Sequence, residues 1–421
     1  MALPLDGVKV LDFSRFLSGP YCTSVLADMG AVVTKVERYP NGDDARRLEP
    51  KVNGESYPFA TANRNKRSLC LDLKSDEGRN IFLRLAKDAD VIIENFRPGV
   101  TKRLGVDYEA VRELNNQIIY CSITGFGQTG PYAMRAGFDI IAQGVSGFMR
   151  INGQPEDEKP AKVGIAINDI AAGATALYSI LGAYIYRLNT GEGQYIDISL
   201  VDSGLAWTIW EAGAYFGSGE LPAPAGSRHR RTTPYQAYRT KDGYVTVGAN
   251  NDRLWRLFCE QVVEQPVWME DPRYQDLPAR MRNIDDLEAD IEEVLAEHPT
   301  EHWVRKLDKA GVPGGPVLLY DEVMSNDHVQ AREMVVEIEH PIIGTMKTLG
   351  IPAKLSRTPL SIRRPAPWLG QHTVETLLEA DYSNEEISDF FEKGIVFDAA
   401  RDGEEAIVEY PPEGHLRRAN W

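Results

Sequence analysis

GVKVLDFSRFLSGPYCTSVLADMGAVVTKVE, residues 7–37, is the stretch that decides the fold. It opens with the apolar run GVKVLDFS, which predicts a buried strand, and residues 20–29 then carry apolar side chains at helical spacing. Gly30 introduces a second apolar run, AVVTKVE, which predicts another strand. A strand, a helix and a strand in this order form the unit from which parallel sheets are built.

The same alternation continues along the chain. We expect a basic turn in RSLCLDLK (67–74), a helix over 76–86, and strands in DVIIENF (90–96) and QIIYCSIT (117–124). The sequence therefore predicts an α/β fold with a doubly wound, mostly parallel, Rossmann-like sheet. Ligands of such sheets bind beyond the carboxyl ends of the strands.

A nicotinamide-dependent dehydrogenase is one alternative, because Glu37 ends the second strand, where a ribose-binding acid would lie. The first turn, however, has Arg, Phe and Leu at residues 15–17, where a dinucleotide needs glycines. A formal GxGxxG covers residues 125–130, but Pro131 follows it and no apolar helix begins there. We interpret it as a chance match or a flexible lid loop, and the dehydrogenase is disfavoured.

Basic side chains recur at or just after several expected strand ends. Their recurrence where ligands bind predicts recognition of phosphate groups through charge-assisted hydrogen bonds. No P-loop accompanies them, which disfavours a nucleoside triphosphatase. The residues are Arg15, Arg38, Arg46, Lys66, Arg67, Lys74 and Arg103.

The composition is typical of a soluble globular protein, with 43% hydrophobic and 26% charged residues in a chain of 421. No apolar run approaches the roughly 20 residues that cross a bilayer, and the first residues lack the pattern of a secretory signal. The four cysteines lie far apart and the seven histidines show no paired-ligand spacing. We expect reduced thiols, no metal, no membrane partner and a cytoplasmic location.

The charge is unevenly distributed. A net charge of −16 argues against nucleic acid as a partner. Residues 1–103 nevertheless carry 17 Lys and Arg against 14 Asp and Glu. A polyanionic ligand is therefore expected to bind in this N-terminal part.

The chain changes character after residue 217. SGELPAPAGSRHRRTTP (218–234) has the Gly, Pro and Arg content of a linker. Two strands, YQAYRT and YVTVGA, and amphipathic helices over 254–263 and 284–295 follow it, which predicts a smaller α+β domain. The expected large domain is discontinuous, with residues 1–225 and 326–421, and the small domain covers 226–325.

One carboxylate lies where a loop becomes a long apolar helix, in AKVGIAINDIAAGATALYSILGAYIYRL (161–188). This residue, Asp169, has two interpretations. As an N-cap it would accept hydrogen bonds from the amides of the first helical turn. As a nucleophile it would lie at the mouth of a buried helix, with the same amides free to bind an oxyanion.

A series of long motifs resembles the family III CoA-transferases, relatives of the formyl-CoA:oxalate and crotonobetainyl-CoA transferases. The resemblance covers nearly the whole chain up to about Val396. Its motifs are PLDGVKVLDFSRFLSGP, GAVVTKVERYPNGDDARR, NRNKRSLCLDLKSDEG, ADVIIENFRPGVTKRLG, SITGFGQTGP, AGFDIIAQGVSG, NTGEGQYIDISL and APWLGQHTVETL. An ordered set of this length is far more specific than any short pattern.

The resemblance implies that Asp169 is the catalytic nucleophile. In the family an aspartate at this place attacks an acyl-CoA thioester and forms a mixed anhydride, and CoA then passes to an acceptor acid through an aspartyl-CoA thioester. An aspartate with its ordinary pKa of about 3.9 is ionised at neutral pH, so we expect no general base. Coenzyme A and its acyl esters are substrates in this chemistry, and no permanently bound cofactor is implied.

The family's CoA contacts carry over to matching positions in this sequence. Two of these residues, Leu71 and Lys74, would flank the adenine. The CoA-binding set that the resemblance implies is Arg15, Phe16, Leu17, Arg38, Leu71, Lys74, Asn95, Phe96 and Arg103.

The sequence departs from the formyl-CoA transferases in two places. Leu17 stands where those enzymes have a polar Gln, and the Gly-rich loop that they fold over the site is absent from residues 226–245. Both departures favour a larger or less polar acid. Arg228, Arg230 and Arg231 are candidates for binding a second carboxylate, with a solvated linker as the alternative. We expect succinyl-CoA as donor and a dicarboxylic or aromatic acid as acceptor.

The α-methylacyl-CoA racemases are similar and move an α-proton with an aspartate and the histidine of a Gly-His-Asp motif. Here the motif reads Gly137-Phe138-Asp139, and no histidine lies in residues 1–225. Phenylalanine cannot exchange a proton, so a racemase is disfavoured. An intramolecular CoA-transfer isomerase would use the same anhydride chemistry and stays open. The resemblance also implies an interlocked homodimer that binds an acyl-CoA and a small carboxylic acid.

Overall fold

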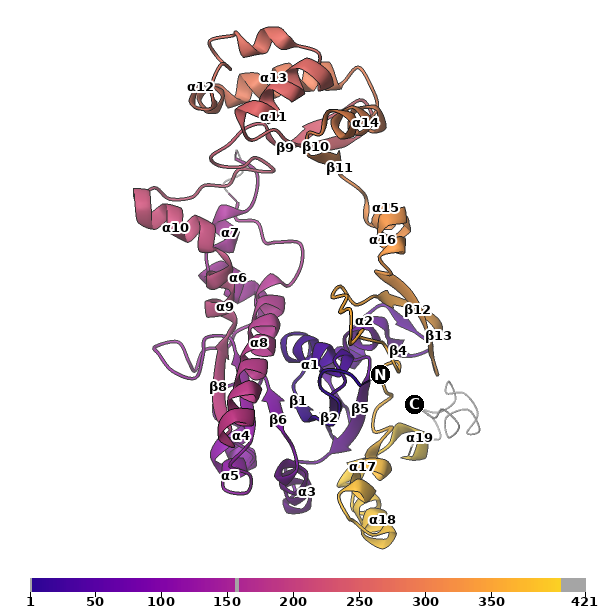
Figure 1. The fold of residues 1–421 in the computed structure, drawn as a ribbon. Coiled ribbons are helices and arrows are strands. Elements are labelled where there is room, and N and C mark those ends of the chain that lie inside the picture. Colours follow the sequence, from indigo (N-terminus) through magenta and orange to yellow (C-terminus); the bar gives the residue numbers. More distant parts are fainter. Residues whose placement is uncertain (1, 156–158, 403–421) are drawn as a thin grey trace. The chain divides into compact units, whose positions relative to one another are not determined.

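The computed structural model describes residues 2–155 and 159–402 (Figure 1). Strands and helices alternate through the N-terminal part, as the sequence predicts. The elements that build the central sheet and its covering helices are β1 (Lys9–Phe13), α1 (Ser18–Asp28), β2 (Val32–Arg38), β5 (Lys66–Leu71), α3 (Asp76–Lys87), β6 (Val91–Glu94), β7 (Ile119–Thr124), α8 (Ile167–Thr190) and β8 (Gln194–Ser199).

The central sheet has seven strands in the order β14-β5-β2-β1-β6-β7-β8. Every pair from β5 to β8 is parallel, and only the edge strand β14 (Val396–Phe397) runs antiparallel to its neighbour. The strand order reverses between β1 and β6, which is the point where Rossmann-like sheets bind their ligands. The predicted α/β class with a largely parallel sheet is confirmed.

One stretch was assigned wrongly from the sequence. RSLCLDLK, expected to form a basic turn, contains all of β5 except its first residue, and β5 pairs with β2 over six residues. The basic residues at the start of β5 are paired: Lys66 is fully buried and bound to Asp12, and Arg67 pairs with acidic residues of the C-terminal part. A buried lysine with a carboxylate partner is compatible with a central strand, and only the fold reveals the partner.

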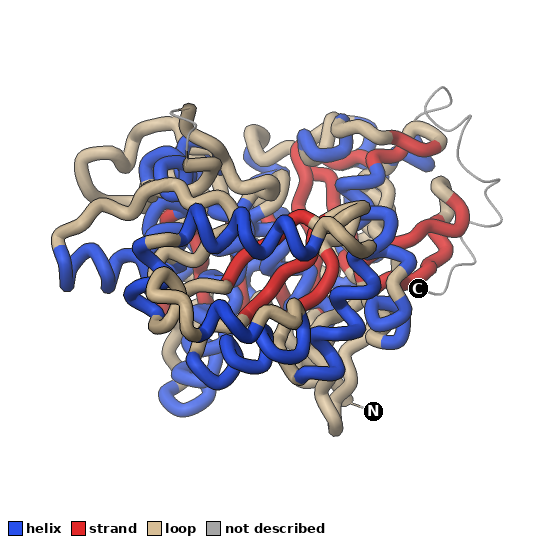
Figure 2. Tube along the Cα trace, turned by 90° about the horizontal axis from the view of Figure 1, so that it is seen from above, coloured by secondary structure: helices blue, strands red, loops and turns tan. Residues whose placement is uncertain are grey.

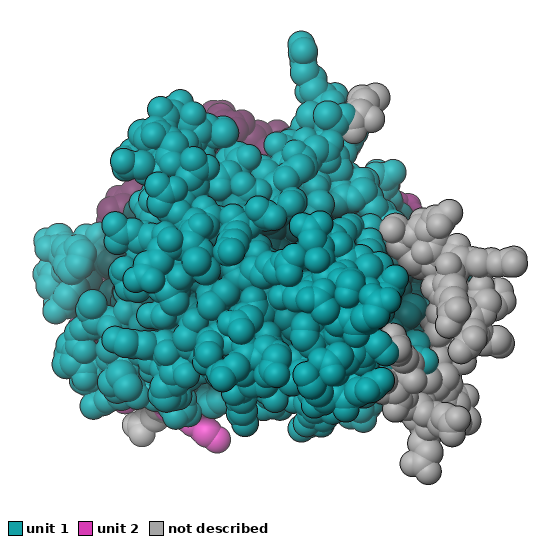
Figure 3. All heavy atoms as spheres, turned by 90° about the horizontal axis from the view of Figure 1, so that it is seen from below, with its two compact units in different colours: residues 1–148, 162–220, 328–421 teal, residues 149–161, 221–327 magenta. Residues whose placement is uncertain are grey.

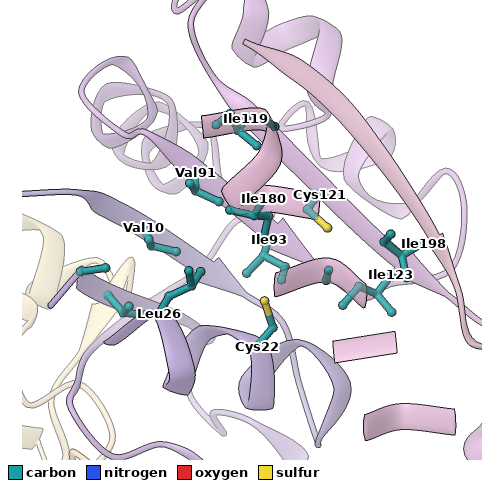
Figure 4. Packing of buried hydrophobic residues seen from close by; sticks show 14 of the residues in the cluster. Val10, Cys22, Leu26, Val91, Ile93, Ile119, Cys121, Ile123, Ile180 and Ile198 are labelled. Atoms are coloured by element: carbon teal, nitrogen blue, oxygen red, sulfur yellow. The ribbon is translucent and has the colours of Figure 1, made fainter. Parts of the chain in front are cut away.

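Helices cover both faces of the sheet. On one face, α1 and α8 lie against the strands (Figure 4). The buried hydrophobic cluster between them includes Leu26, Cys22 and Ile180 of the helices and Val10 and Ile93 of the strands. α1 and α8 approach closely because Gly173 has no side chain: a Cβ there would lie 2.6 Å from the carbonyl oxygen of Ser18. The other face is covered by α3 together with α5 (Tyr108–Arg112), α17 (Thr373–Glu379) and α18 (Asn384–Glu392).

Shorter elements complete this part of the chain. The Trp-rich segment after β8 forms two helices, α9 (Leu200–Trp207) and α10 (Ile209–Ser218), that meet at Thr208. Between Leu349 and Thr373 the chain has neither helix nor strand, and such loops are tan in Figure 2. The remaining elements are η1 (Asp44–Arg47), β3 (Lys51–Val52), β4 (Glu55–Ser56), α2 (Tyr57–Ala62), α4 (Val100–Leu104), α6 (Asp139–Val145), α7 (Phe148–Ile151), α9 (Leu200–Trp207), α10 (Ile209–Ser218), α16 (Asp327–Ala331), β12 (Val335–His340), β13 (Gly344–Leu349) and α19 (Ala399–Asp402).

The chain divides into two compact units (Figure 3). Unit 1 comprises residues 1–148, 162–220 and 328–421, and unit 2 comprises 149–161 and 221–327. Unit 2 has its own core around a three-stranded antiparallel sheet. Its elements are β9 (Tyr235–Arg239), β10 (Tyr244–Gly248), α11 (Asp252–Leu257), η2 (Phe258–Val262), η3 (Pro266–Met269), α12 (Leu277–Arg282), α13 (Ile284–Leu295), α14 (Thr300–Ala310), β11 (Gly314–Pro316) and α15 (Tyr320–Ser325).

Membrane-spanning helices and metal-binding clusters are both absent from residues 2–155 and 159–402. No helix in these ranges has the length and hydropathy needed to cross a membrane. These ranges also contain no group of three or more His, Cys, Asp or Glu side chains that could hold a metal ion.

Candidate functional site

Two adjoining cavities lie at the carboxyl ends of the strands of unit 1. The smaller has a volume of about 580 Å³ and the larger about 970 Å³. They adjoin because Arg15, Phe96 and Arg97 line both. These residues follow β1 and β6, the two strands between which the order of the sheet reverses. The cavities therefore occupy the position where such sheets bind ligands.

All ten site residues predicted from the sequence line one or both cavities. Their contacts with CoA stay a prediction, but the fold does bring them together. The smaller cavity has Arg38, Leu71, Lys74 and Arg103, the larger has Phe16, Leu17, Asn95 and Asp169, and both have Arg15 and Phe96. Sequence reasoning missed Arg97, although it comes directly after Phe96 at a strand end.

The turn after β1 is held by side chains from other parts of the sheet. Phe16 has a φ of 61°, in the left-handed region that large side chains seldom adopt. Asn95 accepts a hydrogen bond from the amide of Arg15 (2.8 Å) and donates one to its carbonyl (2.7 Å). Asp43 accepts a hydrogen bond from the amide of Phe16 (3.1 Å). The turn is thus preorganised, and Asn95 holds the backbone of Arg15 in addition to lining the cavity.

Beneath this turn lies a buried pair of opposite charges. The Lys35 ammonium contacts the Asp43 carboxylate at 2.9 Å and donates a hydrogen bond to the carbonyl of Ser14 at 2.8 Å. Burial alone would raise the pKa of Asp43, but the adjoining Lys35 outweighs it and holds that pKa below its usual range. The carboxylate therefore stays charged while it binds the amide of Phe16.

A second buried lysine anchors the same region from β5. Lys66 donates to the carboxylate of Asp12 (2.9 Å) and to the side-chain oxygen of Asn63 (2.9 Å). Burial lowers the pKa of Lys66 to about 8, although the Asp12 carboxylate acts in the opposite direction. Two residues that looked like phosphate ligands at strand ends have structural contacts instead: Lys66 here, and Arg46, whose guanidinium donates to Glu37.

The smaller cavity is lined by several cationic side chains that can bind a negatively charged ligand. Arg15 and Arg38 share one acidic neighbour, Asp44, at 3.0 and 3.4 Å. Lys74, Arg97 and Arg103 have no carboxylate within ion-pair distance in the described part of the chain. Uncompensated cations around a cavity favour a ligand that carries several negative charges.

Asp169 lies in the first turn of α8 and lines the larger cavity. Its position differs from the N-cap interpretation made from the sequence. The N-cap of α8 is Ala166, and the amides of Asn168 and Asp169 donate to the carboxylate of Asp139, at 2.9 and 3.3 Å. The expectation that these amides are free to bind an oxyanion is therefore wrong, because a carboxylate from α6 already binds them.

The carboxylate of Asp169 is half-buried and, within the described residues, accepts no hydrogen bond. Burial, together with the nearby negative charge of Asp139, raises its pKa to about 7. The sequence-based expectation of an ordinary pKa near 3.9 is wrong for this environment. A poorly solvated carboxylate that is only partly ionised at neutral pH is typical of a functional group rather than of a helix cap.

Neither cavity contains a histidine. Phe138, which occupies the histidine position of the racemase motif, lines the larger cavity with 63% of its surface exposed. The proton relay that a racemase requires has no candidate base at this position.

The arginines proposed from the sequence to bind a second carboxylate lie in unit 2. Arg228 pairs there with Asp285 (2.7 Å) and Glu288, and Arg230 donates to the carbonyls of Ala223 and Ile151. The contacts within unit 2 account for both guanidinium groups.

Comparison with known proteins gives a consistent result. The chain is 38% identical over 395 residues to the succinyl-CoA:glutarate CoA-transferase of Homo sapiens, covering 93% of this chain and 90% of that protein. It is 38% identical over 386 residues to the succinyl-CoA:mesaconate CoA-transferase of Haloarcula marismortui (89% and 96% covered). It is 37% identical over 354 residues to the acetyl-CoA:oxalate CoA-transferase of Acetobacter aceti (84% and 89% covered).

The fold agrees with a solved structure. A CAIB/BAIF family protein from Brucella suis superimposes with a TM-score of 0.81 at 36% identity, covering 90% of this chain and 100% of that one. Residues 5–373 match the family described as CoA-transferase family III. The strand order, the two adjoining cavities and these similarities lead to one conclusion: the chain is an enzyme that belongs to CoA-transferase family III.

Proposed function

We propose that this enzyme moves CoA from succinyl-CoA to a dicarboxylic acid, with Asp169 as nucleophile. The observation that carries the proposal is the poorly solvated Asp169 carboxylate, which faces a cavity continuous with a cation-rich one. The names of the relatives support the substrates, because glutarate, mesaconate and oxalate are all dicarboxylic acids and two of the three names give succinyl-CoA as donor.

The two cavities suit the two ends of a CoA ester. In our proposal the nucleotide occupies the smaller cavity, with its adenine beside Leu71 and Lys74 and its phosphates near Arg38, Arg97 and Arg103. The pantetheine arm passes Arg15 and Phe96, which line both cavities, and brings the thioester to Asp169. Binding energy from the distant nucleotide can then be used to position the reacting thioester.

The proposed chemistry passes acyl groups and CoA through the carboxyl group of Asp169. Asp169 attacks the thioester carbonyl, the carbon–sulfur bond breaks, and an aspartyl mixed anhydride and CoA thiolate form. The thiolate attacks the aspartyl carbonyl, which releases the donor acid with the bridging oxygen and leaves an aspartyl-CoA thioester. The acceptor carboxylate attacks the carbonyl of this thioester, the carbon–sulfur bond breaks, and a second anhydride and CoA thiolate form. Thiolate attack on the acceptor's carbonyl then releases the new CoA ester and regenerates Asp169.

The raised pKa of Asp169 fits this role. A carboxylate with poor solvation loses little hydration when it attacks a carbonyl, and a pKa of about 7 leaves much of it ionised at neutral pH. Asp139 raises that pKa and also holds the start of α8 through the amides of Asn168 and Asp169. We therefore assign Asp139 as a positioning residue.

We also propose a homodimer, interlocked as the family resemblance implies, with unit 1 as the CoA-binding part. Large apolar side chains on α8 and α10 support an interface: Tyr178, Trp210 and Phe216 expose 62%, 71% and 82% of their surface. Large apolar side chains that are this exposed in a single chain are candidates for contact with another protein chain. The cytoplasmic location expected from the sequence stays a prediction.

Trapping of the anhydride tests the proposal. The enzyme is mixed with succinyl-CoA, then treated with hydroxylamine or borohydride, and its peptides are analysed by mass spectrometry. We expect a modification at Asp169 that needs the CoA ester and that Asp169→Ala abolishes together with turnover. Modification of another residue, or normal turnover by the variant, would reject Asp169 as nucleophile. Deuterium uptake at the substrate's α-carbon in heavy water would favour a racemase instead.

A further inference from the structure

The loop between β7 and α6 presents an arginine to the cavity that contains Asp169. The two ends of this loop nearly touch at Gly125 and Gly137, where a Cβ on Gly137 would lie 2.6 Å from the Cα of Gly125. Arg135 comes just before this close approach and lines the larger cavity. Only glycines allow the backbones to meet here, so the base of the loop is fixed where Arg135 enters the cavity.

Contacts inside the loop orient the guanidinium of Arg135. It lies over the ring of Tyr132, 3.7 Å from the ring centre, and Tyr132 in turn meets Phe126 edge-on at 5.8 Å. The amide of Arg135 donates to the carbonyl of Tyr132 at 2.8 Å, which closes a turn. A stacked guanidinium keeps its N–H groups free at its edge, where a carboxylate can bind with two hydrogen bonds.

The charge of Arg135 is not neutralised within the described residues, since no carboxylate lies within ion-pair distance. The other cationic side chains that line the larger cavity either have contacts of their own or also line the smaller cavity. Arg15 pairs with Asp44 (3.0 Å), Lys162 donates to the carbonyl of Val163 (3.2 Å), and Arg97 also lines the smaller cavity with the proposed phosphate-binding residues.

A dicarboxylic substrate needs such a cation. One of its carboxyl groups reacts at Asp169, while the other brings a full negative charge into a cavity that already holds Asp139 and Asp169. Without a positive partner, that charge would be repelled and partly desolvated. Two of the arginines of unit 2 that the sequence offered for this purpose, Arg228 and Arg230, are bound to other groups.

We propose that Arg135 binds the distal carboxylate of the acyl group and of the acceptor acid, and so determines preference for dicarboxylic over monocarboxylic substrates. The proposal rests on the proposed function, since it presumes acyl transfer at Asp169. Arg135 is a specificity-determining residue in this account, because a monocarboxylic acid of the same length reacts without using it.

The test compares matched substrates in Arg135→Gln and Arg135→Lys. The acceptors are glutarate and pentanoate, with succinyl-CoA as donor. In Arg135→Gln we expect kcat/KM for glutarate to fall roughly 10- to 100-fold, the usual effect of removing a charge-assisted carboxylate contact, and kcat/KM for pentanoate to stay within about threefold. Arg135→Lys should recover part of the loss, because it restores charge without the two-pronged geometry.

A control separates this effect from general damage. Arg112→Gln removes an arginine that lines neither cavity, so kcat/KM should stay unchanged for both glutarate and pentanoate. Equal losses for glutarate and pentanoate in Arg135→Gln, no loss for either, or a wild type that prefers pentanoate would each overturn the proposal.

A second measurement distinguishes failure of the Arg135 proposal from failure of the proposed function. Formation of the Asp169 adduct is measured in a single turnover with succinyl-CoA and with butyryl-CoA. We expect Arg135→Gln to slow the adduct with succinyl-CoA selectively. If the wild type forms the adduct but the variant shows no selectivity, Arg135 is rejected alone. If no adduct forms at Asp169 in the wild type, the proposed function is rejected as well.

Discussion

At the scale of single residues, the carboxylate of Asp139 helps to set the pKa of Asp169. Asp139 binds the amides at the start of α8, and its charge adds to burial in raising the pKa of Asp169 to about 7. A nucleophile with this pKa loses activity as the pH falls through 7, because only the ionised form attacks. The acidic limb of the pH profile should therefore report Asp169.

Asp139→Asn tests this coupling. The amide keeps an oxygen for the two backbone N–H groups but removes the negative charge, so the pKa of Asp169 should fall and more of it should be ionised below pH 7. At pH 6 only about one-tenth of a carboxyl with a pKa of about 7 is ionised, so activity at pH 6 relative to pH 8 should rise roughly two- to fivefold. The measurement is kcat/KM against pH for both proteins. An acidic limb that stays in place would contradict the coupling.

At the scale of elements, the turn after β1 shows how distant side chains prepare a binding surface. The positive φ of Phe16 is maintained by Asp43, and the backbone of Arg15 is maintained on both sides by Asn95. These contacts come from β6 and from the segment after β2. The surface that faces both cavities therefore depends on the whole sheet edge rather than on the turn's own sequence.

Asn95→Ala is expected to loosen this turn. The variant loses both hydrogen bonds to Arg15, each worth about 1 kcal/mol, so the KM for the acyl-CoA should rise roughly tenfold while the KM for the acceptor acid changes little. Steady-state kinetics with each substrate varied in turn make the comparison. Asn116→Ala, in an exposed residue that lines neither cavity, is the matched control. A fall in kcat with both KM values intact would indicate another role for Asn95.

The elements also show what the sequence could and could not predict. Continuous apolar runs identified β1 and β2, which are buried on both faces, and apolar residues at helical spacing identified α1 and the long helix α8. β5 was missed because the basic residues at its start, Lys66 and Arg67, suggest a solvated segment until their carboxylate partners are known. The role of Asp139 was missed for a similar reason: its capping of α8 joins two elements that sequence spacing cannot connect.

At the scale of the whole molecule, large apolar side chains of α8 and α10 are exposed in the described unit 1. Charged substitution of one of them, Trp210→Glu, should weaken dimer formation, because a carboxylate buried in an apolar interface has no partner. We expect a shift from dimer toward monomer in light scattering after size-exclusion chromatography. Leu114→Glu, at an exposed apolar residue beyond α5, serves as control. A Trp210→Glu protein that remains dimeric would place the interface elsewhere.

Over one proposed catalytic cycle, Asp169 loses a carboxylate oxygen to the donor acid and receives one from the acceptor acid. If the acceptor carboxylate attacks an aspartyl-CoA thioester, one of its oxygens stays on Asp169 when the new CoA ester leaves. The most direct test uses glutarate labelled with oxygen-18 in both carboxyl groups, followed by mass spectrometry of the peptide that contains Asp169. The account predicts that oxygen-18 enters the Asp169 carboxylate during turnover with succinyl-CoA. Full turnover with no label in that side chain would contradict it.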